Sequence, residues 1–200
     1  MAKVPIMGRV KTRLAREVGA VEAVRFFRHT VGNVLARVGR DRRWQTSISV
    51  APDTGIASPF WPRNSARKRQ GSGDLGQRMQ RVMDEAGPGP VIIIGTDIPA
   101  ITATHIARAF SLLRGADAVL GAAPDGGYWL VGLRRSPRIR APFKAVRWST
   151  ATTLTDTTAN LIGSRIAMTD TLCDVDNAAE LAVASSWFGR RILPLADNQA

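Results

Sequence analysis

Hydrophobic residues recur with helical spacing in some stretches of this chain and form short continuous runs in others. Between residues 20 and 38, Val24, Val31 and Leu35 fall on one face of a helix, and Gly39 follows as a typical helix stop. The run at residues 91–95 is instead rich in β-branched side chains, which is typical of a strand covered on both faces. The pattern predicts amphipathic helices and buried strands in one chain.

Strands and helices alternate along most of the sequence. Further strands are predicted at residues 44–50, 117–122, 128–133 and 165–168, and further helices begin near residues 74, 102, 149 and 177. Thr102 and Ser149 are the predicted N-caps of two of these helices. Residues 55–73, rich in Pro, Ser, Gly and Arg, are expected to form a surface connection. The alternation predicts an α/β sheet with helices on both faces, in a single domain over residues 1–200.

The composition fits this picture. The chain has 200 residues, of which 44% are hydrophobic, so it is long enough to bury a core without disulfides. Cys173 is the only cysteine, so no disulfide can form within the chain, and a reducing compartment is expected. No apolar run approaches the roughly 20 residues that span a bilayer, and no secretory segment is visible at the start. We expect a cytoplasmic protein with no membrane span.

The charge balance is strongly basic, with 28 Lys and Arg against 16 Asp and Glu and a formal net charge of +12. The arginine clusters at residues 40–43, 63–69 and 134–140 all fall where loops are expected. Loop arginines could bind phosphate backbones, but no aromatic residues are interleaved with them and no nucleic-acid motif is present. A solvated basic surface is therefore favoured over a nucleic-acid interface, and nucleic acid is not an expected partner.

Three segments carry residues suited to phosphate or metal chemistry. Residues 8–14 place a glycine and alternating cations before a helix, which suits a polyphosphate, although the spacing is not that of a Walker A loop. Asp97 follows the most strongly predicted strand and could hold a divalent cation that bridges phosphates. Asp174 and Asp176, spaced i, i+2 in an extended segment, would point the same way toward one cation, or would simply provide acidity at a helix start.

Two glycine-containing segments are open to both structural and functional interpretation. Asp74 is an adequate N-cap, and the glycines around it could also let backbone groups contact a base or ribose. Residues 125–128 have the composition of a hairpin turn and indicate no more than that. Cys173, His29 and His105 lack the spacing of a catalytic triad, and we interpret them as structural or solvated.

Six blocks of this sequence occur in the order found in a known family. They are residues 8–14 (GRVKTRL), 73–79 (GDLGQRM), 95–97 (GTD), 125–128 (DGGY), 148–150 (WST) and 174–176 (DVD). On these blocks the chain resembles a bacterial family of proposed glycosyltransferases, some linked to arsenosugar biosynthesis, within the nucleotide-diphospho-sugar transferase superfamily. Relatives in that superfamily include the molybdenum-cofactor guanylyltransferase and 2-phospholactate guanylyltransferase. The resemblance covers nearly the whole chain.

The resemblance implies an A-type glycosyltransferase fold, a Rossmann-like three-layer sandwich with a mostly parallel mixed sheet. It implies a Mg²⁺- or Mn²⁺-dependent transferase with a nucleotide-activated donor, in which Asp97 and Lys11 are the catalytic residues. By analogy, further positions would contact the nucleotide, the metal or the acceptor: for the nucleotide Gly8, Arg9, Lys11, Arg13, Gly73, Asp74, Gly76 and Arg78; for the metal Asp97 with Asp174 or Asp176; for the acceptor Asp125, Gly126, Gly127, Tyr128, Trp148, Ser149 and Thr150.

One departure from the family pattern concerns the first strand. In the family an apolar strand runs into a Lys-x-Pro segment, which here is residues 3–5, almost at Met1. We expect this strand to be missing, because an upstream start was missed or the chain is truncated. The neighbouring strands would then keep unpaired backbone groups, with lower stability and a mobile nucleotide loop as the result.

Three functions remain open at this level. A glycosyltransferase would move a sugar from a sugar nucleotide to a small-molecule acceptor and release a nucleoside diphosphate, and this is the favoured function. A nucleotidyltransferase would use a nucleoside triphosphate and release pyrophosphate. The third is a non-catalytic protein that binds nucleotides or nucleic acid through its basic surface.

Overall fold

The computed structural model describes residues 1–136 and 142–186. In chain order the elements are β1 (Ala2–Lys3), α1 (Thr12–Val18), α2 (Ala20–Val38), β2 (Ser47–Ala51), η1 (Asp53–Ala57), β3 (Ala66–Arg69), α3 (Leu75–Glu85), β4 (Val91–Ile94), α4 (Ala103–Leu112), β5 (Ala118–Ala122), β6 (Tyr128–Leu133), α5 (Thr153–Ala159), β7 (Ile166–Thr169) and α6 (Ala178–Ser186). Within these residues no helix is both long and apolar enough to cross a membrane.

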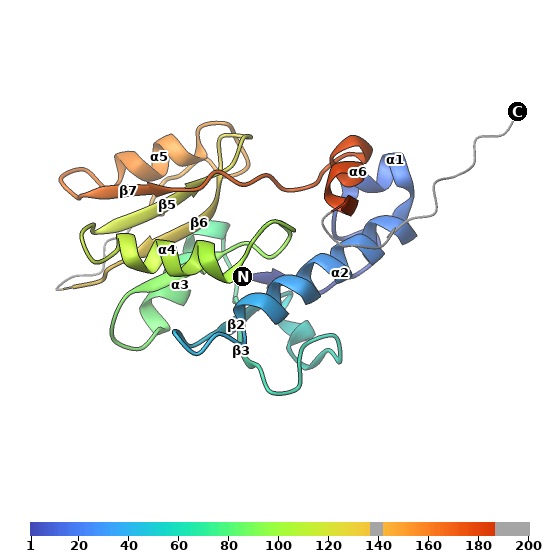
Figure 1. The fold of residues 1–200 in the computed structure, drawn as a ribbon, viewed down its shortest axis with the longest axis horizontal. Coiled ribbons are helices and arrows are strands. Elements are labelled where there is room, and N and C mark those ends of the chain that lie inside the picture. Colours follow the sequence, from blue (N-terminus) through green and yellow to red (C-terminus); the bar gives the residue numbers. More distant parts are fainter. Residues whose placement is uncertain (137–141, 187–200) are drawn as a thin grey trace, which may run out of the picture.

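The strands form two sheets that meet at the start of the chain (Figure 1). The first has the order β1-β2-β3 and is parallel. The second has the order β4-β6-β5-β7, in which β6 runs antiparallel to β4 and β5 while β7 runs parallel to β5. The amino group of Met1 donates a hydrogen bond of 2.6 Å to the carbonyl of Ile94, so the start of the chain links the two sheets.

The first strand, which the sequence comparison within the family led us to expect as missing, is present as two residues. Ala2 pairs with Val50 and Lys3 with Ala51, so β1 occupies the edge of the first sheet next to β4. Because β1 pairs with β2 over only these two residues, the sheets share little backbone bonding at this point. The space beside β1 is therefore bounded by side chains.

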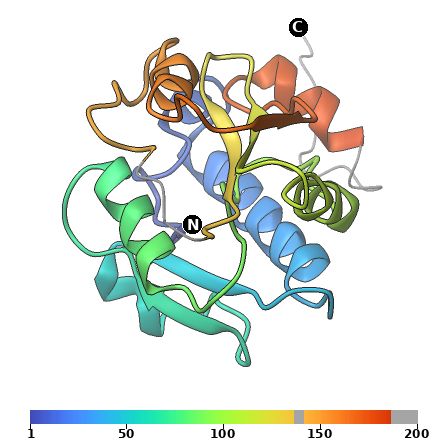
Figure 2. The same ribbon diagram turned by 90° about the vertical axis from the view of Figure 1, so that its left-hand side faces the viewer.

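Helices cover both faces of the second sheet, as predicted (Figure 2). On one face α2 and α4 pack against the strands, with Val38, Ile106 and Leu130 in a common buried cluster. On the other face α3 and α5 do so, with Met83 and Leu120 among the buried residues. A fully buried side chain of this size contributes about 1.5–3 kcal/mol, so these two apolar layers hold the sheet in place.

A separate cluster joins the two ends of the described chain. Leu14 of α1 and Phe26 of α2 pack with Val175 and Leu181, and all four are buried. This packing lays the segment that contains Asp174 and Asp176 beside the start of α1. It therefore positions residues that are far apart in the sequence for the site described below.

Most local predictions from the sequence are confirmed. The long helix spans Ala20–Val38, and Asp74 and Thr102 cap α3 and α4 through capping boxes. His105, interpreted as structural or solvated, is the box partner of Thr102. A capping interaction is worth about 1 kcal/mol, which explains why these helix starts are readable from sequence.

Other local predictions are wrong. Ser149 does not cap a helix, because α5 begins only at Thr153 and Ser149 lies in a turn with a positive φ of 60°. Residues 66–69, expected in a connection, form β3. Residues 12–18, which include part of the expected basic loop, form α1. The arginine cluster at 134–140 and the predicted end of the last helix lie partly outside the described residues.

Candidate functional site

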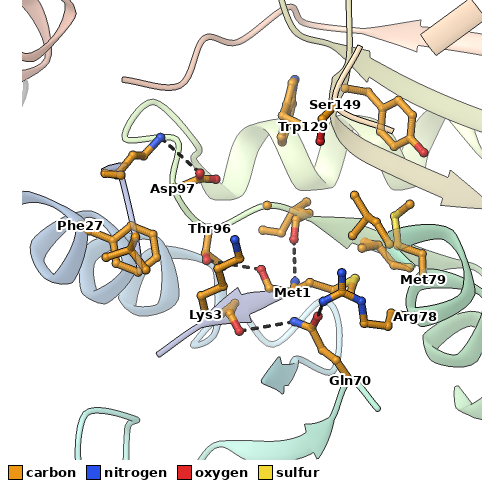
Figure 3. A pocket seen from close by; sticks show the side chains of 18 of the residues that line it. Met1, Lys3, Phe27, Gln70, Arg78, Met79, Thr96, Asp97, Trp129 and Ser149 are labelled. Carbon is orange, nitrogen blue, oxygen red and sulfur yellow. Dashed lines mark hydrogen bonds and ion pairs between the residues drawn. The ribbon is translucent and has the colours of Figure 1, made fainter. Parts of the chain in front are cut away.

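A cavity of about 450 Å³ lies between the two sheets, where β1, β3 and β4 end (Figure 3). Its wall combines the loop before α1, the first turns of α3, the loop after β4 and the start of β6. Among its lining residues are Arg9, Lys11, Gln70, Arg78, Thr96, Asp97, Tyr128 and Ser149. The carboxyl ends of strands are where ligands bind in open α/β sheets, so this position matches the sequence expectation.

Lys11 occupies the centre of a carboxylate cluster at one end of the cavity. Its Nζ lies 3.3 Å from Oδ2 of Asp97, 3.0 Å from Oδ2 of Asp174 and 3.3 Å from Oδ1 of Asp176. The Lys11 side chain is only 4% exposed, whereas the three carboxylates are 32–40% exposed. The structure thus brings together all three residues predicted as metal ligands, around an ammonium group.

The electrostatics of this cluster follow from its burial and its charges. Burial by itself would lower the pKa of Lys11, but the charges of Asp97, Asp174 and Asp176 outweigh it and raise that pKa above its usual value. Burial raises the pKa of Asp174, and the neighbouring Lys11 opposes that shift. Lys11 is therefore a fully charged, buried cation at neutral pH.

The cluster has the oxygen ligands that Mg²⁺ and Mn²⁺ prefer. Among the described residues, however, no group of three acidic, histidine or cysteine side chains is arranged to hold a metal ion by itself. The point on which the three carboxylates converge is taken by Nζ of Lys11. A divalent cation would fit Asp97 and one further aspartate if phosphate oxygens completed its shell and the ammonium moved aside.

The predicted phosphate-binding residues divide into two groups. Arg9 and Lys11 line the cavity. Arg13 is 76% exposed and pairs with Asp176 at 3.1 Å, and Gly8 lies in an exposed turn with a φ of 74°. Lys11 itself adopts a left-handed backbone conformation, with φ 45° and ψ 47°, directly before α1. That conformation costs a non-glycine residue about 1 kcal/mol, so the ion pairs of Lys11 stabilise an otherwise unfavourable turn.

The predicted nucleotide segment at the start of α3 is largely structural in this geometry. Asp74 accepts a hydrogen bond of 2.8 Å from the backbone N–H of Gln77, and the Gln77 side chain packs close to Gly73. A Cβ on Gly76 would lie 2.6 Å from Cζ2 of Trp148, so Gly76 allows α3 to approach that ring. Of this segment's predicted contacts, Arg78 lines the cavity.

The predicted acceptor residues come together around the β5–β6 turn. Asp125 accepts a 2.9 Å hydrogen bond from the N–H of Gly127, which closes the turn, as its composition indicates. Gly126, with φ 83°, packs directly on the backbone of Ala151, so this turn and the loop that holds Trp148, Ser149 and Thr150 lie side by side.

Within that group, Tyr128 and Ser149 line the cavity. Burial raises the pKa of Tyr128 to about 12, although a hydrogen bond from Thr157 opposes the shift. Tyr128 therefore keeps its proton at neutral pH and can donate a hydrogen bond toward the cavity. Trp148 packs against Phe143 with ring centroids 6.4 Å apart, and Thr150 donates to the carbonyl of Arg147 at 2.9 Å.

Two lining residues were not predicted. Gln70 is 4% exposed and bonds to β1, β2 and Arg78. Thr96 is 6% exposed and donates to the carbonyl of Met1 at 3.4 Å. Both residues closely follow a strand, which was the available signal, but β3 was not recognised and Asp97 drew attention away from Thr96.

The fold is shared with solved structures. A protein of Desulfovibrio desulfuricans G20, described as a proposed nucleotide-diphospho-sugar transferase, matches with 30% identity and a TM-score of 0.82 over 91% of this chain and 83% of that chain. Two cytidylyl-transfer enzymes match at low identity. A 4-diphosphocytidyl-2C-methyl-D-erythritol synthase of Anaerococcus prevotii DSM 20548 matches with 12% identity and a TM-score of 0.54, over 94% of this chain and 97% of that chain. These likenesses confirm the predicted nucleotide-diphospho-sugar transferase fold.

The second of these, a 2-C-methyl-D-erythritol 4-phosphate cytidylyltransferase of Thermus thermophilus, matches with 11% identity and a TM-score of 0.50, over 94% of this chain and 98% of that chain. At such low identities the two cytidylyl-transfer enzymes are evidence of fold alone. The comparison with curated proteins finds no match. The family whose pattern matches residues 34–150 is described as an uncharacterized protein conserved in bacteria. That match covers more than half of the sequence, and the chain therefore belongs to the DUF2064 family.

Proposed function

We propose that this protein is a transferase that uses a nucleotide-activated donor and that the group it transfers is a sugar. The observation that carries the proposal is the cavity itself, where Arg9, Lys11 and Arg78 face one space directly beside Asp97. Cations around a cavity at the ends of strands suit the phosphates of a nucleotide. The choice of a sugar as the transferred group is supported by the solved structure at 30% identity, described as a proposed nucleotide-diphospho-sugar transferase.

The cations have a clear task in such a reaction. When the bond between the sugar and the diphosphate breaks, negative charge develops on the departing phosphate oxygen. Arg9 and Lys11 offset that charge from fixed positions, and a buried cation does so more effectively than one in water. The acceptor supplies the oxygen that forms the new bond to the sugar, so no nucleophile of the protein is required. Tyr128 and Ser149 line the acceptor side.

We assign the divalent metal, Mg²⁺ or Mn²⁺, to Asp97 together with Asp174 or Asp176. When bound, the cation would bridge the diphosphate oxygens and neutralise part of their charge. Lys11 is paired with the same carboxylates, which makes it the group that shifts its contacts from carboxylate to phosphate when the nucleotide enters. Asp97 is the central residue of this proposal, because it closely follows β4 and lines the cavity.

Product analysis tests this function. The protein is incubated with a panel of sugar nucleotides and, separately, nucleoside triphosphates, each with Mn²⁺ and a mixture of small-molecule acceptors. Release of a nucleoside diphosphate from one sugar nucleotide is the expected result, and Asp97→Ala should abolish it. Asp84→Ala is the matched control, since Asp84 is exposed on α3 and bonds only to Gln80 among the contacts of the described chain. Pyrophosphate release from a triphosphate would instead identify a nucleotidyltransferase.

A further inference from the structure

Gln70 is a buried polar residue in the wall of the cavity, and all its polar groups are used. Its backbone N–H donates to Val50 at 3.0 Å, and its carbonyl accepts from Arg81. Its side-chain Nε2 donates to the carbonyl of Ser49 at 2.9 Å and to that of Ala2 at 3.4 Å. Gln70 thus ties the end of β3 to β1 and β2, as Figure 3 shows in part.

These bonds fix the orientation of the side-chain amide. Because both carbonyls require a donor, Nε2 faces the strands and Oε1 faces the opposite side, toward Arg78. Nη1 of Arg78 donates to this Oε1 at 3.2 Å, and Nε of Arg78 donates to the carbonyl of Asp74 at 3.2 Å. A flipped amide would place NH₂ against the guanidinium and would leave acceptors unsatisfied, which costs more than an ordinary hydrogen bond contributes.

Arg78 is consequently held at two of its nitrogens and remains available at the third. Among the contacts of the described residues, Nη2 has no hydrogen-bond partner, and Arg78 lines the cavity. A guanidinium that is fixed on one edge loses less rotational freedom when its other edge binds a ligand. The wall of the cavity therefore contains a preorganised pair of residues at the opposite end from the Lys11 cluster (Figure 3).

We propose that Gln70 is a positioning residue that directs Arg78 toward a hydrogen-bond acceptor on the bound nucleotide. The inference rests on the proposed function, since it takes the ligand of the cavity to be a nucleotide. The acceptor is either a carbonyl of the base or a phosphate oxygen, because a guanidinium only donates. Gln70 itself does not touch the ligand, since its side chain is occupied by Arg78, Ser49 and Ala2.

A double-mutant cycle measures this coupling. Wild type, Gln70→Met, Arg78→Met and the double variant are titrated by calorimetry with the one nucleoside diphosphate, from UDP, CDP, GDP and ADP, that binds wild type most tightly. Loss of a hydrogen bond from a charged donor weakens binding about tenfold, so we expect about this loss in Gln70→Met and at least as much in Arg78→Met. The double variant should bind no more weakly than Arg78→Met, because without Arg78 nothing remains to be positioned.

The controls separate positioning from folding and base from phosphate. Gln80→Met removes an exposed amide on the same helix and should leave the affinity unchanged. Gln70→Met also leaves two carbonyls unpaired and lowers stability, so Gln70→Glu is the second variant. It restores an acceptor beside Arg78 but not the donor, and should recover binding relative to Gln70→Met without recovering its thermal midpoint. Inorganic pyrophosphate, which has no base, binds Arg78→Met as well as wild type if Arg78 contacts the base, and more weakly if it contacts a phosphate.

The outcomes are distinct. Losses that add up in the double variant, or an unchanged affinity in Gln70→Met, would overturn the positioning role. Equal weakening in Gln70→Met and Gln70→Glu would do the same. If none of the four nucleotides binds wild type, the proposed function fails together with this inference, whereas nucleotide binding with additive losses removes only the inference.

Discussion

Nζ of Lys11 lies 3.3 Å from Oδ2 of Asp97, although one residue immediately precedes α1 and the other follows strand β4. Asp174 and Asp176 reach the same ammonium from the segment before α6. Three distant parts of the chain therefore meet at one buried positive charge. This contact couples the charge balance of the cavity to the position of the loop before α1.

Removal of this charge should make the carboxylates a better metal site. In Lys11→Met we expect Mn²⁺ to bind the nucleotide-free protein about tenfold or more tightly than wild type, because two unit charges about 4 Å apart interact strongly even at a partly exposed site. Isothermal titration with Mn²⁺ measures this affinity. Arg13→Met, which removes an exposed cation from Asp176, is the matched control and should have a much smaller effect. Equal Mn²⁺ affinities in wild type and Lys11→Met would contradict the account.

The same substitution should lower the stability of the protein. Because the three carboxylates are about one third exposed and water screens them, we expect a loss of about 1–2 kcal/mol in the free energy of unfolding. The folded pKa of Lys11 is raised, so its stabilisation is fully present below the unfolded value of about 10.4 and is lost only above it. Urea denaturation should thus give the same difference at pH 6 and pH 9, and a difference that halves within this interval would argue against a raised pKa.

The loop beside the cavity depends on an ion pair with the opposite pH dependence. Asp156 accepts hydrogen bonds from the backbone N–H, Nε and Nη2 of Arg147 at 3.0, 3.0 and 2.8 Å. These bonds from Arg147 lower the pKa of Asp156 to about 2. The stabilisation is therefore present above the unfolded pKa of about 3.9 and is lost as the pH falls toward 2.

Asp156→Asn should consequently be less stable than wild type at pH 6 and equally stable near pH 2. Chemical denaturation at both pH values measures the two differences. In an Arg147→Met background, where the hydrogen bonds from the guanidinium are already gone, the substitution should have a much smaller effect at pH 6. A stability difference that persists unchanged at pH 2 would show that the ion pair is not its source.

The contact between α3 and the Trp148 loop can be tested through a glycine. A Cβ at Gly76 would lie 2.6 Å from Cζ2 of Trp148 and 2.7 Å from the carbonyl oxygen of Phe143. Gly76→Ala should therefore displace α3 and cost about 1–3 kcal/mol of stability. Gly87→Ala, where a Cβ meets no atom within 4 Å, is the control and should be neutral. Equal thermal midpoints for the two variants would contradict this packing.

The elements that could be predicted from the sequence are those with local signals. The helix Ala20–Val38 carries a long apolar face and a terminal glycine, and α3 and α4 carry capping boxes that act within one turn. Strand β3 has the sequence ARKR and lies at a sheet edge with exposed side chains, so no apolar pattern marks it. Its pairing with β2 is a backbone interaction that sequence patterns do not encode.

The candidate site was predictable as a set of residue types but not as a set of contacts. Asp97, Asp174 and Asp176 were identified individually, yet their common contact with Lys11 depends on the packing of α1 and α2 against the segment around Val175. Gln70 had no signal of its own, because its role comes from bonds to two strands and one helix that are distant in sequence. The roles assigned to these residues in binding and catalysis stay predictions.

The most direct test of the account is the thermal stability of the protein with a panel of sugar nucleotides and nucleoside triphosphates, each with and without Mg²⁺ or Mn²⁺. A ligand that binds only the folded state raises the midpoint by mass action, and about 2.7 kcal/mol is expected at a hundredfold excess over its dissociation constant. The account predicts a metal-dependent rise with one sugar nucleotide, and its absence in Asp97→Ala. No rise with any nucleotide, or a rise with triphosphates alone, would contradict it.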